Sequence, residues 1–171
     1  MALLVVTAGA AQPGAGQEFH PPPVRRAGEH GTRLGFFGFG MRGGIDTRSP
    51  TQLILGATFD AGNLFSDRCR IRPSAEIGVF NARNSYVASV EAVYRLTPED
   101  QHATPYLGGG LSVAGHDRCG SDPSCPGVWV NALLGVELHY RSTFSWLLEY
   151  HAMDVFQHNR LYVGLTTRRG N

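Results

Sequence analysis

The chain has 171 residues, of which 42% are hydrophobic and 17% charged, and its formal net charge is +1. This length suits a single domain, and the charged fraction is below the roughly 25% typical of soluble proteins. The near-neutral charge excludes the basic excess of a typical nucleic-acid-binding protein. Apolar and aromatic residues recur to the end of the chain, which excludes a disordered protein.

The first residues have the pattern of an export signal. Residues 2–11, ALLVVTAGAA, form an apolar run followed by small residues, which predicts a secretory signal peptide over residues 1–11. No Lys or Arg precedes the run, so either the signal is weak or its start is truncated. A buried N-terminal strand is the alternative. Residues 12–31 are rich in Pro and Gly, which predicts a flexible linker, and residues 169–171 are expected to form a short tail.

From residue 32 onward, apolar residues recur with a period of two, which indicates strands and no long helix. Eight alternating segments lie between Gly-, Pro- and Asp-rich breaks, at 32–42, 51–61, 70–80, 85–96, 104–115, 128–140, 144–153 and 159–168. Most are longer than the roughly 5–6 residues of a typical soluble strand and match the about 9–11 residues of a tilted transmembrane strand. The pattern predicts an all-β chain whose residues 32–168 form an eight-stranded antiparallel up-and-down transmembrane β-barrel.

The two faces of each expected strand differ in size and polarity. In segment 51–61 one face carries Leu53, Leu55, Ala57 and Phe59, and the other Gln52, Gly56, Thr58 and Asp60. Small polar residues with one or two charges suit a narrow, filled lumen, and the apolar face suits lipid. Aromatic residues near strand ends are expected to form the two interfacial girdles; they are Tyr86, Tyr94, Trp146 and Tyr150, with Trp129 and Tyr140 as further candidates.

Two segments resemble a known family. Residues 105–113, PYLGGGLSV, and 160–165, RLYVGL, are similar to strands of the small OmpA/OmpX-type outer-membrane β-barrels, which are porin-like but form no open pore. The resemblance covers about residues 31–168. It implies the outer membrane of a diderm bacterium, with outer-membrane lipid, lipopolysaccharide and the insertion machinery as partners. Such barrels usually end on an aromatic residue, whereas this chain ends TTRRGN.

Charged residues on the small-residue face predict an ion-pair network inside the barrel. The expected members are Arg72, Glu76, Glu91, Arg95, Glu137, Glu149 and Arg160. Pairing segment 70–80 with 85–96 through a short turn places Glu91 opposite or diagonal to Arg72. A three-residue turn at 141–143 turns Glu149 inward, opposite Gly135, whereas a two-residue turn would expose it to lipid at a cost.

Cysteine and histidine positions raise the question of metal sites. Cys119 and Cys125 flank a turn-rich loop, which predicts a disulfide in an exported protein, with a zinc site that includes His116 as the alternative. Cys69 is left unpaired. Glu137 with His139, and Glu149 with His151, each share a face, but the expected register separates the two histidines by roughly 20 Å. We therefore expect no metal and no cofactor.

These features favour a structural or adhesion-like role through loops at 43–50, 81–84, 116–127 and 154–158. The first alternative is a lipid-modifying enzyme of the same architecture, a deacylase or an acyltransferase. His151, Asp154 and His158 cluster near one strand end, but a serine nucleophile is missing beside them, and Ser112 and Ser145 are remote. The second alternative is a soluble lipocalin-like carrier with an apolar interior.

Overall fold

The computed structural model describes residues 32–48, 51–79, 84–97, 102–121, 124–140 and 143–167. The expected signal peptide, linker and tail lie outside these residues. The strands are β1 (Arg33–Asp46), β2 (Gln52–Leu64), β3 (Ser66–Val79), β4 (Ser85–Arg95), β5 (Ala103–His116), β6 (Gly127–His139), β7 (Phe144–Met153) and β8 (His158–Thr167). A short 3-10 helix, η1 (Cys119–Ser121), lies between β5 and β6. Within the described part of the chain, no helix is long and apolar enough to cross a membrane.

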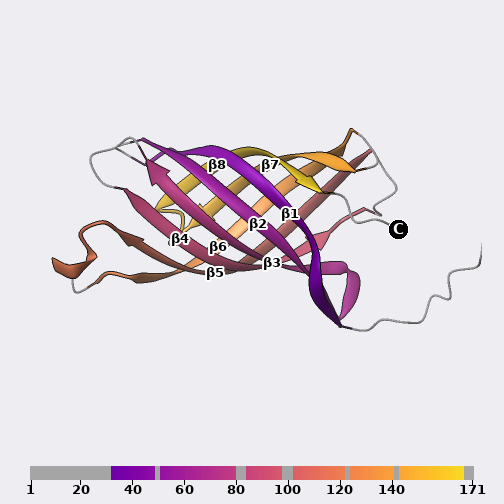
Figure 1. The fold of residues 1–171 in the computed structure, drawn as a ribbon, viewed down its shortest axis with the longest axis horizontal. Coiled ribbons are helices and arrows are strands. Elements are labelled where there is room, and N and C mark those ends of the chain that lie inside the picture. Colours follow the sequence, from indigo (N-terminus) through magenta and orange to yellow (C-terminus); the bar gives the residue numbers. More distant parts are fainter. Residues whose placement is uncertain are drawn as a thin grey trace, which may run out of the picture.

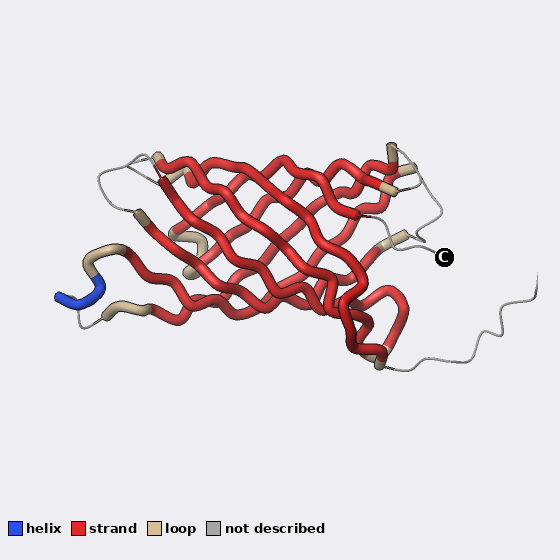
Figure 2. Tube along the Cα trace, viewed as in Figure 1, coloured by secondary structure: helices blue, strands red, loops and turns tan. Residues whose placement is uncertain are grey.

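The eight strands form one closed antiparallel barrel, as the sequence predicted. Each strand pairs with its neighbours in sequence, and β1 pairs with β8 to close the sheet. Figure 1 shows the strands tilted across the long axis, and Figure 2 shows strand along almost the whole described chain. Four connections, β1–β2, β3–β4, β5–β6 and β7–β8, lie at one end, here called the loop end. The opposite end, where the described chain starts and stops, is called the terminal end.

The barrel is apolar outside and polar inside. Along β5 the outward residues Leu107, Leu111 and Val113 are exposed, while the inward Tyr106 and Ser112 are buried. The same alternation recurs around the barrel, and the exposed outward residues include Phe39, Met41, Leu55, Ile77, Val90, Val130, Leu134, Leu148 and Val163. Such a surface is stable only in an apolar medium, and a closed barrel leaves no unpaired strand edge there.

Several strand boundaries differ from the sequence-based prediction, among them the end of β2, which lies at Leu64 rather than at residue 61. A strand end at Arg42 and a loop over 43–50 were wrong, because β1 continues to Asp46. Gly43 and Gly44 look like a turn in the sequence, yet both pair with β2 and with β8. A Cβ on Gly44 would lie 2.2 Å from the carbonyl oxygen of Leu161. This glycine is needed for the close approach of two strands and not for a turn. Similarly, β3 begins at Ser66 rather than at residue 70.

Candidate functional site: a charged network in the lumen

Arg42 on β1 lies at the centre of the charged lumen. Its Nη1 donates a hydrogen bond to Glu149 Oε2 at 2.6 Å, and its Nη2 contacts both Glu76 and, at 3.3 Å, Ser74 Oγ. The guanidinium carbon lies 4.6 Å from the centre of the Tyr162 ring. The side chain is fully buried. One arginine thus joins carboxylates on β3 and β7, which face each other across the lumen.

Glu149 is shared by three donors. Arg72 Nη1 lies 2.5 Å from Glu149 Oε1, and Tyr106 Oη donates to the same oxygen at 2.6 Å. Arg72 also donates from Nη2 to Glu91 Oε2 at 3.1 Å. In the sheet Arg72 pairs with Glu91, and Glu149 pairs with Gly135. In this register of β6 with β7, Glu149 points into the lumen, as expected.

His151 lies between two carboxylates of this cluster. Its Nδ1 is 3.4 Å from Glu91 Oε1, and its Nε2 is 3.2 Å from Glu149 Oε2. The ring is fully buried and meets the Tyr162 ring edge-on, with 5.0 Å between centroids. In the sheet His151 pairs with Leu133, six residues from His139. That separation of roughly 20 Å along the strand prevents the two histidines from sharing a metal ion.

The network continues toward the loop end through Arg160. Arg160 Nη1 donates to Glu76 Oε2 at 2.7 Å, and its Nε donates to Asp46 Oδ2 at 3.0 Å. His158 Nδ1 lies 2.9 Å from the same Asp46 oxygen, and its ring stacks on Trp129 at 4.7 Å. Arg48 Nη1 lies 2.6 Å from His158 Nε2. These side chains form the part of the network nearest the loop end.

A second group lies toward the terminal end. Arg95 Nη2 donates to Glu137 Oε2 at 2.7 Å, and His139 Nε2 lies 4.0 Å from the same oxygen. A polar cavity of about 40 Å³ lies beside this pair, bordered also by Thr58 and Leu147. The seven residues expected to form one network all face the lumen, with Arg95 and Glu137 paired toward the terminal end.

The arrangement can keep the lumen closed. Each buried carboxylate of the central cluster has at least one arginine partner, and such pairing offsets the large cost of removing charges from water. Tyrosine hydroxyls use further carboxylate oxygens, as Tyr162 Oη does by donating to Glu76 Oε2 at 2.7 Å. A network whose charges are balanced and hydrogen-bonded is rigid, because any displacement strands a buried charge.

Sequence reasoning missed several members of this network. The omitted residues are Arg42, Asp46, Tyr106, His158 and Tyr162. A signal for the most central of them was present, because Gly38, Gly40 and Arg42 alternate with the apolar Phe39 and Met41. The misplaced end of the first strand hid it.

The aromatic residues expected at the girdles fall into two groups. Tyr86, Tyr94 and Trp146 point outward and are exposed. Tyr150 is half-buried, and its Oη donates to Asn159 Oδ1 at 2.6 Å. Trp129 does not belong to a girdle. It packs inside the barrel against Val87, Ala114 and Met153, because its position on β6 is on the inward face.

The cysteines at the loop end form the expected disulfide, Cys119–Cys125. His116 lies close enough to both sulfur atoms for the three to be considered as metal ligands. The disulfide, however, uses both thiolates that zinc would need. Cys69 is free and half-buried on β3, opposite Tyr94.

Comparison with known proteins supports the architecture. The N-terminal β-barrel domain of Pseudomonas aeruginosa OprF is similar, with a TM-score of 0.59 and 13% identity over 78% of this chain and 98% of that one. Neisserial surface protein A is also similar, with a TM-score of 0.57 and 15% identity over 76% of this chain and 94% of that one. No protein-family model and no curated protein sequence matches the chain.

Structural similarity at such low sequence identity supports the fold alone. The chemistry of the outer surface indicates the medium in which the barrel is stable. A closed eight-stranded barrel with exposed leucines, valines and aromatics outside and paired charges inside belongs in a bilayer. Closed transmembrane barrels of this kind are found in bacterial outer membranes. The chain has the fold and the surface of an outer-membrane β-barrel.

Proposed function

We propose that the chain is a non-conducting scaffold of the outer membrane that presents its loop end to partners outside the cell. The observation that carries this proposal is the filled lumen, in which Arg42, Glu76, Arg72 and Glu149 join opposite walls through buried ion pairs. A barrel closed in this way offers no path for solutes, so its exposed ends are the surfaces left for interaction. The partners implied for assembly are outer-membrane lipid, lipopolysaccharide and the insertion machinery.

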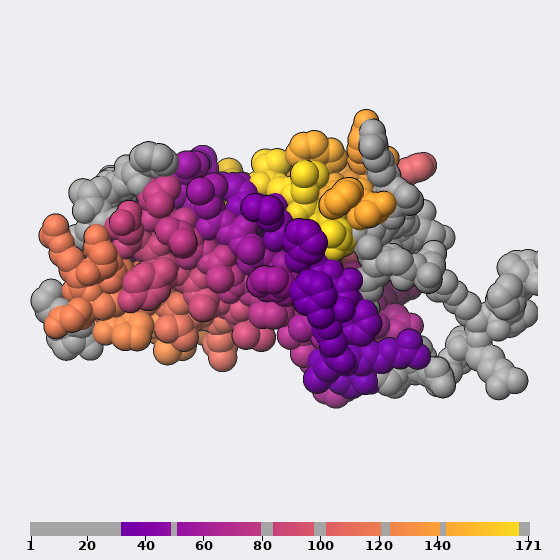
Figure 3. Space-filling view, viewed as in Figure 1, coloured from indigo at the N-terminus to yellow at the C-terminus, as the bar shows by residue number. Residues whose placement is uncertain are grey.

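The loop end carries a projecting connection that is constrained by a disulfide. The β5–β6 connection projects beyond the other strands and forms the tip at the left of Figure 3. The disulfide Cys119–Cys125 ties its two sides together, and Tyr86 Oη donates to Cys119 Sγ at 3.3 Å. A constrained loop loses less conformational entropy on binding than a free one. This favours an adhesion-like role for the segment 117–126.

The alternatives find less support in the described residues. The described contacts of His151 are Arg42, Glu91, Glu149 and the Tyr162 ring. Those of His158 are Asp46, Arg48 and the Trp129 ring. None of these can act as the nucleophile of a lipid deacylase. A soluble lipocalin-like carrier needs an apolar interior, whereas the interior here is charged.

The test combines a conductance measurement with an adhesion measurement. Purified protein in planar bilayers is expected to produce no stable conductance steps. A non-adherent bacterial host that expresses the chain should gain adhesion to an epithelial cell layer, and replacing residues 117–126 by a short turn should abolish the gain. The matched control replaces residues 80–84, the β3–β4 connection, and should leave adhesion unchanged. Steady channel currents, or adhesion that does not depend on residues 117–126, would contradict the proposal.

A further inference from the structure

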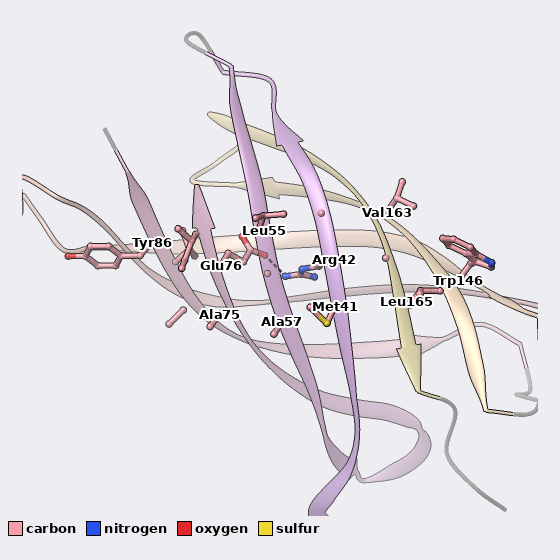
Figure 4. Close-up of a pocket in the computed structure, with 16 residues that line it drawn as sticks. Met41, Arg42, Leu55, Ala57, Ala75, Glu76, Tyr86, Trp146, Val163 and Leu165 are labelled. Carbon is pink, nitrogen blue, oxygen red and sulfur yellow. Dashed lines mark hydrogen bonds and ion pairs between the residues drawn. The ribbon is translucent and has the colours of Figure 1, made fainter. Parts of the chain in front are cut away.

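The outer surface of the barrel carries a long apolar groove that the scaffold role does not require. It has a volume of about 830 Å³ and crosses the outward faces of β7, β8, β1, β2, β3 and β4. Ligand pockets in proteins usually have volumes of about 300–1,000 Å³. In Figure 4, Trp146 and Tyr86 lie at opposite ends of the groove, with Met41, Ala57 and Ala75 between them.

The strand register explains the groove. Its floor is a row of directly paired outward residues with short side chains, Ala57, Ala75 and Ala88. The next outward row toward the loop end carries Leu55, Ile77 and Tyr86, which also line the groove. Alanines beside a row of bulky side chains leave a trough.

The same row continues to the other end of the groove. Ala57 pairs with Met41, Met41 with Leu165, and Leu165 with Trp146. Six strands joined at about 4.8 Å per step give a length of roughly 24 Å. Trp146 is near the start of β7 at the terminal end, and Tyr86 is near the start of β4 at the loop end. The groove therefore runs obliquely from one interface of the bilayer toward the other.

The position and the width of the groove indicate which kind of molecule can occupy it. The groove lies within the apolar outer band, so hydrocarbon surrounds it. The outward lining residues belong to two neighbouring rows, two residues apart along each strand, such as Leu55 and Ala57, whose Cα atoms are about 7 Å apart. This spacing is below the roughly 10–12 Å diameter of an α-helix. An extended acyl chain is narrow and long enough to fit.

The loop end of the groove supplies a place for a charged headgroup. Tyr86 Oη donates to Cys119 Sγ at 3.3 Å, so the groove ends beside the loop that carries His116 and Arg118. Arg118 is exposed there. Arginine beside an interfacial tyrosine favours a phosphate group at the membrane surface.

We propose that this groove binds one acyl chain of a phosphate-bearing anionic lipid from the loop-side leaflet, with the phosphate near Arg118. The proposal rests on the membrane placement above but not on adhesion. It assigns the row Ala57–Ala75–Ala88 the role of a lipid-binding floor. Substituting larger side chains there closes the groove while leaving the outer face apolar, so the barrel itself keeps its stability.

The test counts lipids retained by the folded protein. The chain is refolded in a zwitterionic detergent, dimyristoylphosphatidylglycerol is titrated in, and native mass spectrometry records the bound lipid. The original chain is expected to retain one lipid. The variant A57L/A75L should lose apparent affinity by at least about tenfold. The matched control A92L/A132L adds the same bulk to outward alanines on β4 and β6, outside the groove, and should bind as the original chain does.

Two further comparisons complete the test. R118Q should weaken binding of dimyristoylphosphatidylglycerol several-fold. If the double variant A57L/A75L fails to fold, the single variant A88L replaces it as the variant that closes the groove. Equal retention by the groove-filled and original chains, or no retained lipid, would overturn the proposal. A doubled chain mass that only the groove variants abolish would assign the groove to a second copy and also overturn it. A heat-dependent mobility shift on a gel verifies the barrel separately, so an original chain that shows this shift but retains no lipid rejects this inference alone.

Discussion

Arg42 and Glu149 are 107 residues apart in sequence, yet Arg42 Nη1 and Glu149 Oε2 lie 2.6 Å apart in the middle of the lumen. Both side chains are fully buried. Arg42 belongs to the first strand and Glu149 to the seventh, so this ion pair forms only when the sheet has closed. The pair therefore links the closing of the sheet into a barrel to the filling of the interior by charged side chains.

The loss in free energy of unfolding when a lumen carboxylate is neutralised should depend on how deeply that carboxylate is buried. We expect Glu149→Gln to lower the free energy of unfolding by about 3–5 kcal/mol, because Arg42 and Arg72 would lose a shared buried partner. The measurement is urea unfolding of the protein in lipid vesicles. The same change at Glu137, which pairs with Arg95 near the terminal end, should cost less. Equal losses at the two positions would contradict the central role of Glu149.

The close contact between Gly135 and Tyr106 gives a second prediction. A Cβ on Gly135 would lie 2.6 Å from the Tyr106 ring, so Gly135→Ala must displace the ring and its hydrogen bond to Glu149. We expect a loss of about 1–3 kcal/mol in the free energy of unfolding. In a Tyr106→Leu background the same change should cost less, and the remaining cost would come from the Leu148 carbonyl oxygen, 2.9 Å from the same Cβ. Gly43→Ala, where the nearest atom is 3.7 Å away, is the control, and strictly additive losses would refute the contact.

The two tryptophans should report opposite environments. Trp146 points outward and is 47% exposed, whereas Trp129 packs inside the barrel against His158. In vesicles that contain brominated lipid, the fluorescence of Trp129→Phe, which retains Trp146, should be strongly quenched. The fluorescence of Trp146→Phe should be quenched weakly. The reverse order would mean that the inner and outer faces are exchanged.

Removing the disulfide should affect the loop and not the barrel. The variant C119S/C125S is expected to lower the free energy of unfolding by no more than about 2 kcal/mol, because a bridge between cysteines six residues apart removes little chain entropy from the unfolded state. Limited proteolysis should cut residues 117–126 faster than in the original chain. A large loss of barrel stability would show that this loop supports the sheet.

Much of the inner surface could be predicted because alternation in a strand assigns each residue to one face. Arg72 and Glu91 meet as their register predicts, and Glu149 pairs with Gly135 and faces inward, as the expected register of these two strands required. Ladder pairing and burial both follow from period and turn length, which are local properties of the sequence.

Other features depend on contacts that no local pattern encodes. Gly43 and Gly44 have the composition of a turn, and only pairing with β8 keeps them in the strand. Likewise, the hydroxyl bonds from Tyr106 to Glu149 and from Tyr162 to Glu76 depend on which strands face each other across the lumen. The outer groove needs the register of six strands at once, so single-strand periodicity does not reveal it.

The central claim is that the apolar face of every strand meets lipid and the charged face fills the lumen. Refolding the chain from residue 18 onward with and without detergent micelles, followed by gel electrophoresis of boiled and unboiled samples, tests it most directly. We predict β-type circular dichroism and a heat-dependent mobility shift only in micelles. A soluble, folded monomer in the absence of detergent would contradict the claim, because the residues assigned to lipid would then form its core.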